Sequence, residues 1–411
     1  MTAAAIFSNV AAEQVPGGDV IQSALRFVRN HLDMEAAYLS EFIGDDLVFR
    51  AVDAPGFEDL ASPGKSLPLN QVYCEHILAG RLPEIIKDTQ DIALAKTIPI
   101  TDAVGIRSHV SVPIKRRDGS TYGMFCVLSR SPKADLNTRD LEVMRAFADI
   151  SADQVNEKIS VKTELEQLRS DLERVIEEQL YSILLQPIMN VTTRHPVGFE
   201  ALTRFKSEPY RSPNLWFDDA NRVNMQVELE LAVIVTALKM LPHLPEPAYI
   251  SVNASPVTVA SGKLFDVLNT APLDRVVLEV TEHAEITDPV AMLSEISNLR
   301  AHGLRLAVDD AGAGYSGLQQ IVQLNPDIIK LDISLTSGIE KDIVRRFLAE
   351  ALVGFAEQTE AKIVAEGIET EAELAALRAL RVPLGQGYLL GRPADLITAQ
   401  SWFPGASLKK A

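Results

Sequence analysis

The sequence predicts an α+β domain with an antiparallel sheet, then a long helix, then a (β/α)8 barrel. Three observations predict this arrangement. Roughly the first 150 residues contain two pairs of strand-like runs among helical patterns. Residues 139–180 continue as a single helical pattern. From about residue 180, eight strand-like runs follow one another, with helical patterns between most of them.

Composition and charge narrow the functional classes. The chain has 411 residues and a net charge of -17, which argues against bulk binding to nucleic acid or to anionic membranes. Only Cys74 and Cys126 are present, so no disulfide framework is expected. We find no signal peptide, and the most apolar helical stretch, 229–241, is shorter than the ~20 residues of a membrane span. A cytoplasmic location is therefore expected.

The predicted first domain covers residues 19–155. Apolar residues at helical spacing predict helices over 19–33 and 71–80, and a further helical pattern starts near Asp135. Two hairpins are predicted, each turned by an acid-glycine pair. Their strands are 37–42 with 46–52, and 108–115 with 122–128.

A linking helix is expected over residues 156–180. Its apolar residues Leu165, Leu168, Leu172 and Val175 alternate in steps of three and four, which is a short heptad seam. Two interpretations remain open at this stage. The helix either buries one face between the domains of its own chain, or it forms a parallel dimer that passes a signal between them.

The predicted barrel domain covers residues 181–400. Its helical patterns lie at 226–241, 288–302, 340–358 and 371–380, and Thr370 with Glu373 forms a capping box at the start of the last. The first two strands are too close for a crossover helix, so they are expected to form a hairpin. The eight strand-like runs are 183–189, 196–202, 248–253, 275–281, 304–310, 327–332, 362–366 and 385–390.

Polar residues lie near the ends of seven of these strands. In a barrel such ends meet at one rim, where enzymes of this fold carry their active sites. A single residue of this kind is usually a satisfied core group or a helix cap, but seven strands are not easily explained in that way. The residues are Glu200, Asn253, Glu279, Glu282, Asp309, Asp310, Lys330, Asp332, Glu366 and Gln386.

These residue types predict a metal site. The adjacent acids Asp309 and Asp310 repel each other, and a bound cation would keep both ionised. Carboxylate and amide oxygens favour Mg2+ or Mn2+ over Zn2+. The number of carboxylates favours two ions, bridged by Asp309, which would act on a phosphate. Lys330 would orient the attacking water or neutralise charge, or else form a salt bridge with Asp332 or Glu366.

The first domain resembles a GAF domain. The resemblance is carried by Y-C-E-H-I-L-A-G-R-L-P-E-I-I-K-D-T at 73–89, G-I-R-S-H-V-S-V-P-I at 105–114, Y-G-M-F-C-V-L at 122–128 and D-L-E-V-M-R-A-F-A-D at 140–149. GAF domains bind small molecules or tetrapyrroles, or only mediate dimer contacts. Neither a bilin-attachment Cys-His pair nor the N-K-F-D-E signature is present, so no ligand is assigned.

The second domain resembles an EAL domain, the family of cyclic di-GMP phosphodiesterases. After the triplet Glu200-Ala201-Leu202, six further motifs follow in order over about 230 residues. These motifs are S-V-N-A-S-P at 251–256, L-E-V-T-E at 278–282, D-D-A-G-A-G-Y-S at 309–316, P-D-I-I-K-L-D at 326–332, V-A-E-G-I-E-T at 364–370 and G-Q-G-Y-L-L-G-R-P at 385–393.

This resemblance implies a TIM-like barrel with one antiparallel strand and hydrolysis of cyclic di-GMP to linear pGpG. It implies that Lys330 contacts the attacking water and that Glu282 anchors the loop after Asp310. A homodimer through the linking helix and the EAL domain is expected, without nucleic-acid or membrane partners. The implied metal ligands are Glu200, Asn253, Glu279, Asp309, Asp310 and Glu366, and the implied substrate contacts are Leu202, Arg204, Gln386 and Pro393.

Two residues depart from the family pattern in the loop after the paired acids. Ala311 replaces the usual Phe, and Gly317 replaces the second residue of the usual Ser-Ser. The alternative function is therefore a cyclic di-GMP receptor without turnover that signals through the helix. Under the principal interpretation, the chain is a phosphodiesterase regulated by its GAF domain.

Overall fold

The computed structural model describes residues 8–9, 18–281, 288–311 and 322–403. The chain divides into two compact units, residues 1–164 and 165–411, and the helix α5 (Thr138–Glu177) belongs to both. No helix in the described ranges combines the length and the apolar character needed to cross a membrane.

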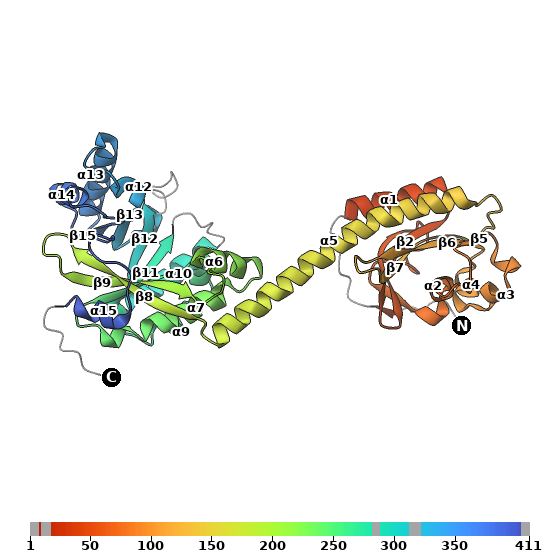
Figure 1. Ribbon diagram of the computed structural model, residues 1–411, viewed down its shortest axis with the longest axis horizontal. Coiled ribbons are helices and arrows are strands. Elements are labelled where there is room, and N and C mark those ends of the chain that lie inside the picture. The colour runs from red at the N-terminus through yellow and green to blue at the C-terminus, as the bar shows by residue number, and fades with distance from the viewer. Residues whose placement is uncertain (1–7, 10–17, 282–287, 312–321, 404–411) are drawn as a thin grey trace. The chain divides into compact units, whose positions relative to one another are not determined.

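The first unit is a seven-stranded sheet with helices on both faces (Figure 1). The predicted hairpins are β2 (Ala36–Ile43) with β3 (Asp46–Asp53), and β6 (Ser108–Lys115) with β7 (Thr121–Ser129). They lie side by side because β2 pairs with β7. The short strands β1 (Ser8–Asn9), β4 (Lys65–Pro68) and β5 (Ile85–Ile86) complete the sheet and were not predicted.

The two faces of this sheet have separate apolar cores, as the alternation of side chains along each strand requires. Helix α1 (Gly18–His31) and the start of α5 cover one face, where Leu25 and Met144 are buried. The other face is covered by α2 (Tyr73–Leu78), α3 (Ala93–Thr97) and α4 (Pro99–Val104). Cys74 and Cys126 are buried free thiols in this second core.

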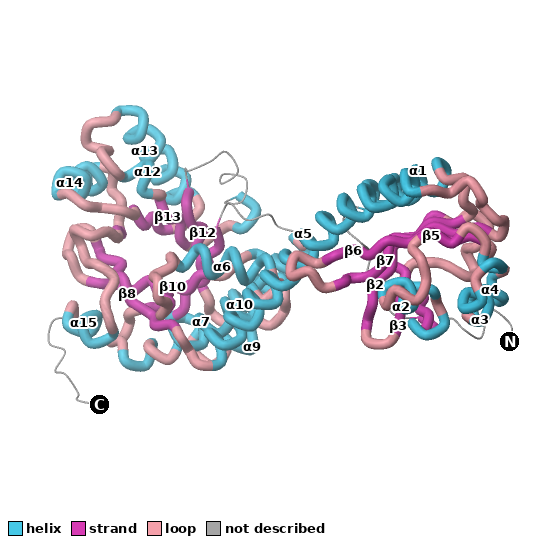
Figure 2. The backbone as a smooth tube through the Cα atoms, turned by 45° about the vertical axis from the view of Figure 1, so that its right-hand side comes forward, coloured by secondary structure: helices cyan, strands magenta, loops and turns pink. Residues whose placement is uncertain are grey.

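The second unit is a closed eight-stranded barrel, which confirms the predicted fold (Figure 2). Strands β8 (Tyr181–Asn190) and β9 (Pro196–Phe205) form the predicted hairpin, and β8 is antiparallel to both of its neighbours. The remaining pairs are parallel. Their strands are β10 (Tyr249–Asn253), β11 (Val276–Thr281), β12 (Arg305–Ala311), β13 (Ile328–Leu331), β14 (Lys362–Ala365) and β15 (Leu384–Gly385).

The predicted last strand, 385–390, is wrong in its extent because β15 ends at Gly385. Gly387 has a φ of 155°, and a Cβ there would meet the backbone N of Ile368 at 2.2 Å. The backbone therefore turns away from the barrel at a position that only glycine fits.

Helices surround the barrel strands (Figure 2). The four predicted helices are α7 (Gln226–Leu238), α10 (Pro289–Ala301), α13 (Ile343–Gln358) and α14 (Glu371–Ala379). The capping box of Thr370 and Glu373 is present at α14, as expected. Further helices are α6 (Pro213–Arg222), α8 (Pro256–Ala260), α9 (Leu264–Leu268), α12 (Ile333–Thr336) and α15 (Leu396–Ser401).

The seam of the linking helix faces the barrel unit of its own chain. Leu172 and Val175 are 1% and 3% exposed within the barrel's core cluster, and Leu165 and Leu168 pack against it. In addition, the Arg169 guanidinium donates to the carbonyl of Val223. For these four residues the structure therefore shows a face that packs within its own chain. A parallel dimer through the helix stays a prediction.

His109 makes the first unit sensitive to acid. The imidazole is fully buried beside the Tyr73 ring, and neither ring nitrogen has a hydrogen-bond partner among the described residues. Burial lowers the pKa of His109 to about 3. In the unfolded chain the pKa is about 6.5. Between these values the unfolded state binds the extra proton, so stability falls as the pH drops, by about 1.4 kcal/mol per pH unit.

We expect His109→Phe to flatten this dependence, because it removes the group that must become charged on unfolding. Calorimetry of the full chain at pH 7 and pH 5 would measure the loss of stability between these two pH values. The unfolding transition that responds to the substitution is assigned to the first unit. His31→Gln, at the exposed end of α1, is the control. An identical loss of stability in His109→Phe and the unsubstituted chain would contradict the assignment.

Candidate active site

The interior of the barrel changes from apolar to polar in a single step along every strand. An apolar layer contains Ile188, Tyr249, Val277, Ala307, Ile328, Val364 and Leu384. Two residues further along the parallel strands, and two residues earlier on the antiparallel strand β8, lie Gln186, Ser251, Glu279, Asp309, Lys330, Glu366 and Gln386. Because side chains alternate with a period of two, both layers point into the barrel.

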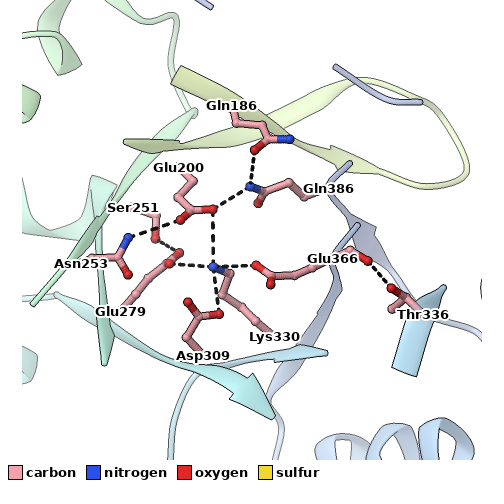
Figure 3. A network of polar contacts seen from close by, with 10 residues as sticks. All are labelled: Gln186, Glu200, Ser251, Asn253, Glu279, Asp309, Lys330, Thr336, Glu366 and Gln386. Atoms are coloured by element: carbon pink, nitrogen blue, oxygen red, sulfur yellow. Dashed lines mark hydrogen bonds and ion pairs between the residues drawn. The ribbon is translucent and has the colours of Figure 1, made fainter. Parts of the chain in front are cut away.

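Strand β9 follows the same rule with a glycine in the apolar layer. A Cβ on Gly198 would lie 2.6 Å from the Tyr249 ring, so this ring fills the space of a β9 side chain. Glu200, two residues later, joins the polar layer. Figure 3 shows the residues of this layer joined in one connected network. Glu366 and Gln386 directly follow β14 and β15, and the other residues lie within their strands.

Lys330 is the centre of the network. Its ammonium nitrogen lies 2.7 Å from both Glu279 Oε2 and Glu366 Oε1, 3.1 Å from Asp309 Oδ1 and 3.5 Å from Glu200 Oε2. The side chain is 1% exposed, so these contacts replace its hydration. The predicted alternative, a salt bridge between Lys330 and Glu366, is therefore present. The Asp332 carboxylate instead accepts from the backbone N–H of Ser334 and caps α12.

Amide and hydroxyl groups orient the carboxylates. Gln386 Nε2 donates to Glu200 Oε2 over 2.6 Å and to Gln186 Oε1 over 3.1 Å, and Asn253 Nδ2 donates to Glu200 Oε1 over 3.3 Å. The Ser251 hydroxyl donates to Glu279. The carboxylates of Glu200 and Glu279 thus each accept from a donor other than Lys330, and this limits the rotation of both carboxylates.

One ammonium does not compensate four carboxylates. Burial raises the pKa of Glu279 and of Glu366 to about 8, although Lys330 opposes the shift in both. Burial by itself would lower the pKa of Lys330, but the surrounding carboxylates outweigh it and raise that pKa well above its usual value. Near neutral pH these two carboxyls therefore hold a proton when no cation is bound, and a bound divalent cation would displace it.

The donor set fits a hard divalent cation, since it consists of carboxylate oxygens and the amide oxygen of Asn253. In the ranges that the structure describes, no three acidic, histidine or cysteine side chains are arranged so that they could hold an ion. The ammonium of Lys330 lies among the carboxylates instead. The side chain of Asp310, Glu282 and the loop positions Ser316 and Gly317 lie outside the described part, so the expectations for them stay predictions.

Two cavities flank the network and share Glu200 and Asp309. The first, of about 350 Å3, is also lined by Lys330, Glu366 and Gln386, with Tyr388. The second, of about 530 Å3, is lined by Leu202, Arg204 and Asn253. The predicted substrate contact Pro393 lines neither cavity among the described residues and precedes Ala394, which bridges to β8.

Sequence analysis missed several residues of the site. Gln186 and Ser251 are polar residues at inward positions of apolar strands, so the same alternation could have identified them. Tyr210 lies in a loop without a motif and lines the larger cavity with 67% of its surface exposed. Ala311, in contrast, was recognised as unusual and is fully buried in the barrel core, opposite Leu331.

Two family models match the chain, one in each unit. The model of the EAL domain matches residues 169–393, more than half of the chain, and that of the GAF domain matches residues 18–153. A probable cyclic di-GMP phosphodiesterase of Escherichia coli, PdeD, is 26% identical over 55% of this chain and 44% of its own length. An uncharacterized signaling protein of Caulobacter vibrioides is 29% identical over 81% of this chain and 41% of its own length. The chain thus spans less than half of these relatives.

Solved structures extend the comparison. The phosphodiesterase PaMucR in complex with c-di-GMP is 28% identical, with a TM-score of 0.52 over 57% of this chain and 99% of its own. An EAL domain protein from Listeria monocytogenes is 27% identical, with a TM-score of 0.51 over 56% of this chain and 94% of its own. The chain therefore belongs to the EAL-domain family and carries a GAF domain ahead of its EAL domain.

Proposed function

We propose that the chain is a divalent-cation-dependent phosphodiesterase that hydrolyses cyclic di-GMP to linear pGpG under the control of its GAF domain. The observation that carries this proposal is the Lys330-centred carboxylate network, which lies next to two cavities that share Glu200 and Asp309. The choice of cyclic di-GMP as substrate rests on the relatives that are named as cyclic di-GMP phosphodiesterases.

The residues that would hold Mg2+ or Mn2+ are Glu200, Asn253, Glu279, Asp309, Asp310 and Glu366. Such ions stabilise charge on a phosphate and lower the pKa of a bound water. Lys330 would balance the negative charge that develops when water adds to phosphorus, because its ammonium already lies among the carboxylates. The water oxygen joins phosphorus, the bond to one 3′ oxygen breaks, and a proton passes to that oxygen.

The two cavities suit a substrate with two nucleosides around its phosphates. Each cavity presents an exposed aromatic ring, Tyr388 in one and Tyr210 in the other. Leu202 and Arg204 lie with Tyr210, and Gln386 lies with Tyr388. We infer that one base enters each cavity while a phosphate lies at Glu200 and Asp309, which line both.

We propose control by the GAF domain because α5 is one continuous helix. Met144 of this helix is buried in a core of the first unit, and Leu172 is buried in the core of the barrel. A change in the first domain can therefore reach the barrel without crossing a flexible linker. A homodimer remains a prediction.

The direct test incubates the purified chain with cyclic di-GMP and Mn2+ and looks for pGpG by chromatography. Glu200→Gln removes an anionic oxygen that Gln386 and Asn253 hold in place, so we expect turnover to fall by two to three orders of magnitude. Glu357→Gln, an exposed carboxylate paired with Arg381, is the control and keeps full activity. Binding of cyclic di-GMP without any pGpG would instead support the receptor function.

Tyr210 tests the assignment of the larger cavity to a base. Stacking of a base on an aromatic ring contributes about 1–3 kcal/mol, so Tyr210→Ala is expected to raise KM roughly tenfold. Tyr210→Phe keeps the ring and should keep KM within about twofold. Steady-state kinetics of both variants measures the effect, and an unchanged KM in Tyr210→Ala would remove this ring from the substrate site.

A further inference from the structure

One buried acceptor of the polar network has no partner among the described residues. It is the side-chain amide oxygen of Gln386, Oε1, which is enclosed and receives no hydrogen bond there. Gln386 is 5% exposed and lines the smaller cavity beside Lys330 and Glu366. A buried acceptor that receives no hydrogen bond is costly, so this atom points to a donor that enters the cavity with a ligand.

The direction of the Gln386 amide follows from its neighbours. A primary amide carries two N–H donors on its nitrogen, whereas its oxygen only accepts. Gln386 Nε2 lies 2.6 Å from Glu200 Oε2 and 3.1 Å from Gln186 Oε1 (Figure 3). Both of these oxygens are acceptors, and together they use both N–H groups. The capacity that remains to the Gln386 amide is therefore that of an acceptor.

Gln186 supplies the second acceptor because its own direction is fixed. Its side chain is 8% exposed, and its Nε2 donates to the carbonyl of Gly391 over 3.3 Å, so its Oε1 faces Gln386. The reversed amide would set its oxygen against that carbonyl oxygen. The segment of Gly391 is itself held on β8, where Ala394 and Leu185 exchange two backbone hydrogen bonds.

We propose that Gln186 is a positioning residue of the phosphodiesterase site and acts through Gln386. The inference rests on the proposed function, because it assigns Gln186 a part in that reaction. By accepting from one N–H of Gln386, Gln186 keeps the amide from donating into the cavity and holds Oε1 there as an acceptor. This position therefore takes a group with an O–H donor and repels an ionised phosphate oxygen, which only accepts.

Two O–H donors fit this position. One is the attacking water, which an acceptor would orient for addition to phosphorus. The other is the 2′-hydroxyl of a ribose, which would lie between a base at Tyr388 and a phosphate at Glu200 and Asp309. Both present the same chemistry to Oε1, and kinetics with two substrates separates them.

Steady-state kinetics of Gln186→Met, Gln386→Met and the double variant, at saturating Mn2+, tests the proposal. Methionine keeps the length of the side chain and removes the amide. We expect Gln186→Met to lose about tenfold in kcat/KM, the order of one hydrogen bond. The double variant should lose no more than Gln386→Met alone, since Gln186 acts through Gln386. Gln186→Leu takes its place in the cycle if Gln186→Met does not fold.

The 2′-deoxy analogue of cyclic di-GMP identifies the donor. If the donor is the ribose, the unsubstituted chain shows a KM about tenfold higher for the analogue, and Gln186→Met raises that KM no further. If the donor is the attacking water, the analogue keeps the KM of cyclic di-GMP, and the loss in Gln186→Met lies in kcat. The matched control is Gln358→Met, at the exposed end of α13, which keeps full activity.

Two results would overturn this inference alone, in a chain that turns cyclic di-GMP over. One is an unchanged kcat/KM in Gln186→Met. The other is a double variant whose loss is the product of the two single losses, because the two amides would then act independently. Absence of turnover in the unsubstituted chain would instead overturn the proposed function, and the inference with it.

Discussion

The ion pairs between the Lys330 ammonium and the carboxylates of Glu200, Glu279, Asp309 and Glu366 are the interaction on which the polar layer of the barrel depends. Four acids at the centre of a barrel repel one another, and burial makes their ionised forms costly. Breaking a buried ion pair by removing one partner costs about 3–5 kcal/mol, so the ammonium is required for these acids to coexist. Burial still raises the pKa of Glu279 and of Glu366 to about 8, so under the proposed function bound cations would replace the protons of these two acids.

The barrel builds this cluster by alternation. An apolar layer, to which Ile188 and Leu384 belong, fills the interior, and the next inward residue of each strand is polar. The Tyr249 ring against Gly198 completes the apolar layer where β9 has no side chain. The cluster thus lies next to an apolar layer and also lines the two cavities. A rigid closed sheet holds the carboxylates, whereas Tyr210 and Tyr388 come from connecting segments, where relatives can vary without disturbing the cluster.

Most of the architecture could be predicted because long strands and amphipathic helices leave a clear periodicity. The strands β1, β5 and β15 have two residues each, which is too short for such a pattern. The seam from Leu165 to Val175 shows a different limit, since apolar spacing indicates that a face is buried and not what buries it. In the site, motifs identified the carboxylates and Lys330. Tyr210 could not be identified because its loop reaches the cavity only through the tertiary fold.

The central claim is that the network around Lys330 holds divalent cations. Titration of the chain with Mn2+, with free Mn2+ followed by its electron paramagnetic resonance signal, tests it most directly. The account predicts about two ions retained per chain in the presence of cyclic di-GMP. It also predicts weaker retention in Glu200→Gln and unchanged retention in Glu357→Gln. Failure to retain Mn2+, or equal retention in Glu200→Gln, would contradict it.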